Sequence, residues 1–208
     1  MLYSANFCVI DCETGGFSSE KNPIVEIAVV ILNYKLEEVG RYDSLIRPYD
    51  DSLEITDGAL QANGLTREEI DQGEDIKVVV KELCTLFNKT KGGKKSFLVC
   101  HNTPFDIKFI EAMFKVGKQD IYKYIDKQTL DTLVLSRLAW GHDNNTENHK
   151  LRTACKNAGI ELINAHRAMA DTVATAELFR YFMSKLRGES KEITTSKPKA
   201  KFRDTFKI

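Results

Sequence analysis

The stretch FCVIDCETGG, residues 7–16, begins as an apolar run and then places two acids, Asp11 and Glu13, inside it. The run predicts a buried strand, and Gly15 and Gly16 favour a turn after it. Because every second side chain of a strand shares a face, Asp11 and Glu13 point to the same side. That arrangement suits the binding of one or two cations. Taken alone, the pair is better explained as the polar end of a strand.

The rest of the chain predicts an α/β fold. Two more segments rich in β-branched residues, 24–33 and 41–47, follow after short connections typical of an antiparallel meander. A helical region comes next, with its clearest part at 75–88, and then an apolar run at 97–100 that resembles a buried strand. Three or four helices complete the pattern, at Pro104–Val116, Thr132–Ala139, Lys150–Ala158 and Met169–Leu186. Strands that alternate with helices after a meander indicate a mixed sheet flanked by helices.

Composition sets the domain organisation and limits the mode of binding. We expect one domain over residues 1–188 and a flexible, charged tail over residues 189–208, which has no periodicity. The tail is a candidate tether to a polymerase or another protein partner. The 30 basic and 30 acidic residues leave no net charge, which argues against tight binding along extended nucleic acid. Neutrality is compatible with an enzyme that grips one end of a strand.

Cysteine usage and hydropathy predict a cytoplasmic protein. The five cysteines form no C-x-x-C pair, and several lie in apolar runs as small hydrophobic residues. We expect no membrane segment, because the longest apolar run contains Glu26. We also expect no secretory signal, because the N-terminus lacks a basic region followed by an apolar stretch. The sequence leaves the oligomeric state open.

Two further acids lie at the starts of predicted helices. Asp106 follows Thr103, a candidate helix cap, and it shares its helix face with apolar residues three, four and seven positions later. Asp171 likewise shares the apolar face of the last helix, with Ala174 and Leu178 three and seven positions later. An acid in a first helical turn also interacts favourably with the helix dipole, which is the alternative explanation of Asp106, but its place on the apolar face slightly favours a functional role. Buried carboxylates are costly unless a cation neutralises them.

His166 lies five residues before Asp171. Five helical residues rotate by about 140°, so the two side chains converge only if His166 lies in the loop and Asp171 in the first turn. A histidine there can accept a proton near neutral pH. The plainer alternative is a surface histidine, and we expect the same of His149, beside a polar loop at 141–149. Asp131 is most simply a helix N-cap.

Together these segments resemble the DEDDh group of 3′–5′ exonucleases, which have the ribonuclease H-like fold. Residues 9–15 resemble the first motif of that group, residues 101–106 the second, and residues 166–171 the third, H-x₄-D. The likeness runs in order over residues 5 to 186. It implies a ribonuclease H-like α/β fold and the release of nucleoside 5′-monophosphates from a single-stranded nucleic-acid 3′ end.

The resemblance also assigns roles to individual residues. It implies that two Mg²⁺ or Mn²⁺ ions are held by four carboxylates and that His166 is the general base; the carboxylates are those of Asp11, Glu13, Asp106 and Asp171. Hard cations prefer such oxygen ligands, and two of them suit an in-line displacement at phosphorus. The resemblance further implies contacts to the substrate from Thr14, Gly15, Phe17 and Asn102.

The family contains several substrate classes. The segments 13–17 and 63–65 are more similar to the epsilon proofreading subunit of bacterial replicative polymerase and to ribonuclease T than to oligoribonuclease. We expect DNA as the substrate, with RNA 3′-end trimming as the alternative. A catalytically silent nucleic-acid-binding module is the alternative from another class, although no motif residue is missing. A structural metal site is disfavoured, because Zn²⁺ prefers Cys or His ligands.

Overall fold

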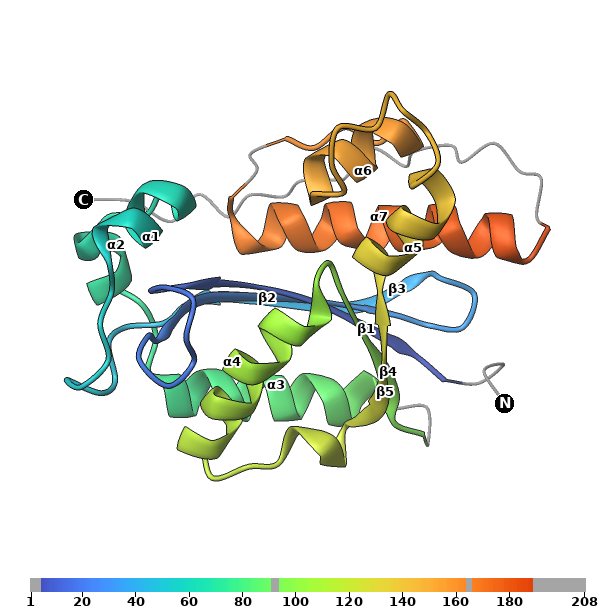
Figure 1. Cartoon of the computed structure of the whole chain (residues 1–208). Helices are drawn as coiled ribbons and strands as arrows, with labels where there is room; N and C mark the ends of the chain where they lie inside the picture. The colour runs from blue at the N-terminus through green and yellow to red at the C-terminus, as the bar shows by residue number, and fades with distance from the viewer. Residues whose placement is uncertain (1–4, 91–93, 164–165, 189–208) are drawn as a thin grey trace, which may run out of the picture.

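The computed structural model describes residues 5–90, 94–163 and 166–188. A five-stranded sheet in the order β3-β2-β1-β4-β5 forms its centre (Figure 1). The strands are β1 (Phe7–Thr14), β2 (Ile24–Leu32), β3 (Glu38–Leu45), β4 (Ser96–Cys100) and β5 (Ile125–Asp131). The first three form the predicted antiparallel meander, and β4 and β5 add parallel strands. The expected mixed α/β sheet is confirmed.

Helices cover both faces of the sheet (Figure 1). One face packs on α3 (Ile76–Thr90) and α4 (Thr103–Val116), and the opposite face packs on α7 (Ala168–Leu186). The helices α5 (Thr132–Trp140) and α6 (Leu151–Ala158) pack beside α7. Two short helices, α1 (Asp57–Asn63) and α2 (Arg67–Asp71), lie at one end of the sheet, and a 3₁₀ turn at Ile121–Lys123 precedes β5.

Alternation along β1 divides the core into two parts. Cys8, Ile10 and Cys12 pack with α3 and α4, whereas Phe7 and Val9 pack against α7. The odd-numbered residues of β1 therefore face α7, and the same parity directs Asp11 and Glu13 to that side. The prediction that these two acids share a face agrees with this register.

The register of β1 also leaves part of one strand edge open. β4 pairs with β1 only over residues 7–9, so beyond Val9 the strand is paired with β2 alone. The chain leaves β4 through a sharp turn at Asn102, whose φ of 85° is left-handed, and enters α4 at once. The first turn of α4 is thereby brought to the end of β1 that carries the two acids.

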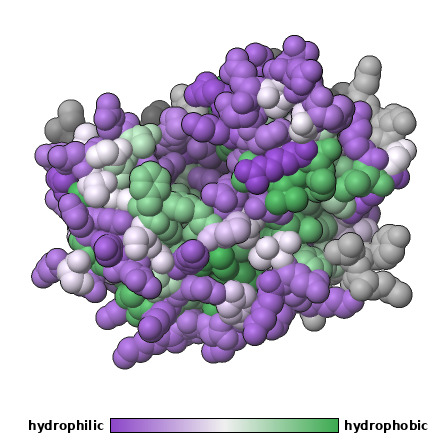
Figure 2. Space-filling view, in the orientation of Figure 1, coloured by the Kyte–Doolittle hydropathy of each residue, from purple (hydrophilic) through white to green (hydrophobic). Residues whose placement is uncertain are grey.

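The surface in Figure 2 is hydrophobic over its middle and hydrophilic above and below. Exposed hydrophobic residues include Phe17 before β2 and Val134 and Leu138 on α5. Within the described ranges, no helix is both long and apolar enough to span a membrane. The predicted tail at 189–208 lies outside the described residues.

Candidate active site

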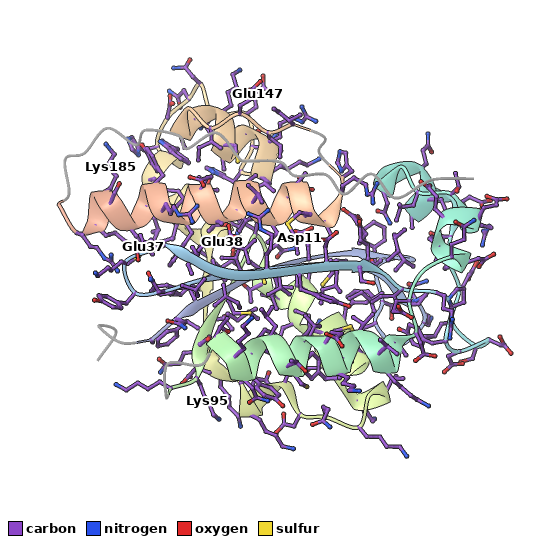
Figure 3. All side chains as sticks on the ribbon, turned by 180° about the vertical axis from the view of Figure 1, so that it is seen from behind. Asp11, Glu37, Glu38, Lys95, Glu147 and Lys185 are labelled. Carbon is purple, nitrogen blue, oxygen red and sulfur yellow. The ribbon has the colours of Figure 1, made fainter. Side chains whose placement is uncertain are left out.

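Three of the predicted carboxylates meet between the sheet and α7. Asp11 and Glu13 come from β1, and Asp171 comes from the first turn of α7. Each offers an oxygen, and these oxygens all lie within 4.8 Å of one another. Figure 3 shows Asp11 in the layer between the sheet and α7. This separation is short enough for a single cation to contact oxygens from all three side chains.

Asp106 reaches the same region from the opposite helix layer. It lies in the first turn of α4 and is 4% exposed, on the buried stripe that contains Phe109, Ile110 and Met113. This agrees with the predicted apolar face. Asp106 is not part of the 4.8 Å group. Among the charged neighbours of Asp11, however, Asp106 raises the pKa of Asp11 the most. The structure thus brings all four acids to one region, and three of them have oxygens within 4.8 Å of one another.

The electrostatics of the site disfavour four ionised carboxylates unless a cation is bound. Burial raises the pKa of Asp11 well above its usual value, and the charges of Asp106, Asp171, Glu13 and Glu26 raise it further. Burial, with Asp171 and Glu26, raises the pKa of Glu13 to about 7, although Arg167 opposes the shift. Burial is also the main cause of the raised pKa values of Asp106 and Asp171. Such a cluster is relieved by protons or by cations.

One oxygen of Asp171 distinguishes these possibilities. Oδ2 accepts a hydrogen bond from the backbone N–H of His166 at 3.2 Å, whereas Oδ1 is buried without a hydrogen-bond partner among the described residues. A buried, unpaired carboxylate oxygen is rare and costs free energy. An oxygen of Asp171 lies within 4.8 Å of oxygens of Asp11 and Glu13, so the donor set is made only of carboxylate oxygen. These residues fit a hard divalent cation.

His166 lies in the loop before α7, as its spacing from Asp171 predicts. It is exposed and has a left-handed φ of 73°. Its backbone N–H holds Asp171, while its imidazole is left to solvent. The residue therefore combines a fixed backbone with an accessible side chain at the edge of the carboxylate group.

A single carboxylate fixes the turn that precedes α4. Asp131 is the N-cap of α5, as predicted, where it accepts the N–H of Leu133 at 2.8 Å. It also accepts the N–H groups of Asn102 and Thr103 at 3.0 and 3.1 Å. The prediction that Thr103 caps α4 is wrong, because the N-cap is Asn102 and the Thr103 hydroxyl donates to the carbonyl of Leu130. Asp131 can serve two helices because β4 and β5 pair Cys100 with Asp131.

Asp131→Ala is expected to lower the free energy of unfolding by roughly 2 kcal/mol, because both helix starts lose their acceptor. Asp131→Asn should cost about half as much, since one oxygen is retained. Urea denaturation of the two variants and the parent would measure the difference. Equal stability of Asp131→Ala and the parent would contradict this double capping role.

The prediction that His149 is a solvated surface residue is also wrong. It is half-buried, and its Nδ1 lies 2.9 Å from the hydroxyl of Ser136, which is fully buried on α5. Its carbonyl lies 2.9 Å from Nε2 of His101, whose Nδ1 contacts the hydroxyl of Thr132 at 2.9 Å. The loop at 141–149 is thereby attached to the turn that leads into α4.

The backbone of the loop after β1 is held by residues of α1 and its N-cap. The carbonyl of Thr14 accepts from the buried Asn63 at 3.0 Å, and the carbonyl of Gly15 accepts the N–H of Thr56 at 2.9 Å. A Cβ at Gly15 would approach the backbone oxygen of Glu54 to 2.9 Å, so only glycine fits there.

The predicted substrate contacts fall into two kinds. The hydroxyl of Thr14 is buried and donates to the carbonyl of Gly16, so it is already used within the loop. Phe17, in contrast, is 95% exposed at the loop surface, and Asn102 is exposed beside α4. Substrate contact by Phe17 and Asn102 is compatible with this exposure, whereas Thr14 is better placed to shape the loop.

Comparison with known proteins places these features in a family. Residues 8–179 match the family model RNase_T, described as Exonuclease. A DNA polymerase III of PolC type from Oceanobacillus iheyensis is 30% identical over 185 residues, which is 89% of this chain but 12% of that protein. A ribonuclease T from Vibrio parahaemolyticus is 32% identical over 182 residues and matches 82% of each chain.

Solved structures show the same fold at lower identity. The zinc-bound complex of E. coli exonuclease I with single-stranded DNA superposes with a TM-score of 0.75 and 22% identity, over 89% of this chain and 42% of that one. A 3′-exonuclease that recognises a histone mRNA stem-loop superposes with a TM-score of 0.69 and 18% identity, over 89% of this chain and 65% of that one.

Proposed function

Because this chain belongs to the RNase_T exonuclease family, we propose that it is a metal-dependent 3′–5′ exonuclease that releases nucleoside 5′-monophosphates. The observation that carries the proposal is the cluster of three carboxylates, Asp11, Glu13 and Asp171, in which one oxygen of Asp171 has no partner among the described residues. A binding module that had lost activity would have no need to keep these charges together at a cost in stability.

The four carboxylates would hold Mg²⁺ or Mn²⁺. Their combined charge is balanced by two divalent cations, which supports a two-metal site with Asp106 as the fourth ligand. Bound divalent cations supply charge stabilisation for an in-line displacement at phosphorus. The protein contributes the fixed orientation of Asp11 and Glu13 on a central strand, which needs no rearrangement before the reaction.

His166 is the candidate general base. Its imidazole is accessible. Its backbone N–H is bound by Asp171, which keeps the residue next to the carboxylates. It would take the proton of the attacking water and leave a hydroxyl-bearing 3′ end on the shortened strand.

The loop after β1 would receive the terminal nucleotide. Phe17 presents an exposed ring on which a base can stack, and such stacking is tolerant of sequence. The lack of net charge fits contact with one strand end, and attachment to a partner would raise the local concentration of substrate. A polymerase is the proposed partner, contacted through the tail.

DNA is the proposed substrate. RNA 3′-end trimming is the second candidate, because the ribonuclease T relative matches this chain over 82% of both lengths. The test compares 5′-labelled single-stranded DNA, duplex DNA with a mismatched 3′ end, tRNA-like RNA and dinucleotides, each with Mg²⁺ or Mn²⁺. Stepwise shortening of mismatched or single-stranded DNA is expected, with fast trimming of RNA supporting the second candidate.

Two controls make this test decisive. A 3′-phosphorylated strand should resist shortening, because a free 3′ hydroxyl defines the end that is attacked. Asp171→Asn purified in parallel should be inactive, which excludes a contaminating nuclease. Absence of cleavage of every substrate by folded, metal-supplied protein would refute the proposal.

A further inference from the structure

Glu26 is a fifth carboxylate beside the site, and the sequence motifs give it no role. It lies on β2 directly opposite Glu13 of β1, and its side chain is 4% exposed. Its charge raises the pKa values of Asp11 and Glu13. By position and burial it resembles an additional metal ligand.

The hydrogen bonds of Glu26 argue against that role. Oε1 accepts from Nη2 and Nε of Arg167 at 2.9 and 3.2 Å. Oε2 accepts from the same Nε at 3.3 Å and from the backbone N–H of Ala168 at 3.1 Å. Both oxygens are therefore occupied and the charge is paired, in contrast to the unpaired oxygen of Asp171.

These contacts all converge on the start of α7. Arg167 is the N-cap residue but makes no side-chain cap within the described helix, and Glu26 takes its place by accepting the N–H of Ala168. The carbonyl of Arg167 accepts the N–H of Asp171 at 3.1 Å, and Asp171 in turn accepts the N–H of His166. One ion pair thus anchors the backbone that carries both a candidate ligand and the candidate base.

We propose that Glu26 and Arg167 are positioning residues that hold the first turn of α7 so that Asp171 and His166 meet the acids of β1. This inference rests on the proposed function. Positioning of this kind affects rate strongly, because misplacement of a reacting group by about 1 Å can cost about 10²-fold. Partners that orient metal ligands without touching the metal have effects of about 10- to 100-fold.

The competing explanation is an ion pair that contributes to stability alone. Glu26 is buried but the side chain of Arg167 is 47% exposed, so loss of the arginine leaves a buried charge unpaired and is the more destabilising single change, whereas replacement of both residues by apolar ones removes that unpaired charge. The single variants Glu26→Met and Arg167→Met should therefore lower both the melting temperature and kcat. The double variant, E26M with R167M, separates the two explanations.

In the double variant we expect a melting temperature above that of Arg167→Met but below that of the parent, because the N–H of Ala168 has lost its acceptor, while kcat stays about 10²-fold low and KM changes by less than about threefold. Recovery of kcat together with the melting temperature would overturn the proposal. The ion pair of Glu38 and Arg41 on β3 provides a matched control. Its double Met variant should keep the kcat of the parent.

A second readout keeps this test separate from that of the proposed function. Activity of the parent and inactivity of Asp171→Asn establish the function independently of Glu26. If the parent is inactive, amide hydrogen exchange still decides: faster exchange in the double variant, confined to residues 166–172, supports positioning. Unchanged exchange at the amides of His166 and Ala168 would overturn it.

Discussion

Asp11→Asn is expected to abolish metal-dependent cleavage and, at the same time, to stabilise the metal-free protein. Asp11 is the carboxylate whose pKa is raised by all of its charged neighbours, and no neighbour opposes the shift. The amide keeps the size of the side chain and removes its charge. We expect a loss of at least about 10³-fold in kcat/KM, because the variant lacks a ligand to the cations that would stabilise the developing charge.

The gain in stability should be about 1 kcal/mol, or about 2–4 °C in melting temperature for a domain of this size. The size of this gain depends on pH in a defined way. Because the folded site has raised pKa values, the folded state binds more protons than the unfolded chain, and the parent loses stability as pH rises. The loss extends from the unfolded carboxylate range, near 4, through the pKa of Glu13, about 7. The advantage of Asp11→Asn should therefore be larger at pH 8 than at pH 5.

Thermal melts at the two pH values, with and without Mn²⁺, measure these effects. Mn²⁺ should raise the melting temperature of the parent by more than that of Asp11→Asn, because the variant has lost a ligand. Glu82→Gln, which removes an exposed charge from α3, is the matched control and should change neither property. A variant that is less stable than the parent at both pH values would show that Asp11 supports the fold instead.

The strand that carries Asp11 could be predicted from sequence because its signals are local. The apolar run of β1, the two-residue spacing of its acids and the following glycines all lie within ten residues. The buried stripe of α4 and the loop position of His166 are local for the same reason. Periodicity reports faces within one element, and those predictions agree with the structure, whereas boundaries shift: the strand predicted at 41–47 is β3, Glu38–Leu45.

The missed features have two causes, which are weak local patterns and contacts between distant segments. β5 escaped prediction because it is an edge strand with mostly polar residues, and only Ile125 is fully buried. The short helices α1 and α2 fall in the region predicted as helical, but their bounds were not predicted because caps rather than periodicity fix them. The ion pair of Glu26 and Arg167 joins residues 141 positions apart. The only sign of this ion pair in the sequence was a glutamate in the otherwise apolar run of β2.

The predicted roles of Asp131 and His149 show the same limit. A cap prediction concerns one helix, whereas Asp131 serves two because the parallel pairing of β4 and β5 brings their ends together. His149 lies in a polar segment, and its burial depends on Ser136 of a neighbouring helix. The sequence identifies such residues as polar, but only the topology assigns them partners.

Replacement of His166 should slow the chemical step while metal binding is retained. The choice of substitution matters, because its φ of 73° is left-handed and an alanine there would strain the backbone. His166→Asn and His166→Gly tolerate this conformation and keep the N–H that holds Asp171. We expect kcat to fall by about 10²- to 10⁴-fold, as is typical for loss of a general base.

The remaining properties of these variants should be close to those of the parent. The imidazole is exposed, so the free energy of unfolding should change by less than about 0.5 kcal/mol. Mn²⁺ affinity, measured by titration calorimetry, should change by less than about threefold, because all four carboxylates are intact. His142→Asn, in the exposed part of the loop at 141–149, is the matched control and should retain full activity.

Added imidazole supplies the sharpest test of His166. In His166→Gly the space of the side chain is vacated without backbone strain, so imidazole in solution should restore part of the lost rate. The rescue should increase with the concentration of the neutral base, since that form accepts the proton. Equal losses of Mn²⁺ affinity and kcat, with no rescue, would assign His166 to the support of Asp171 through its backbone and would leave the general base to be sought elsewhere.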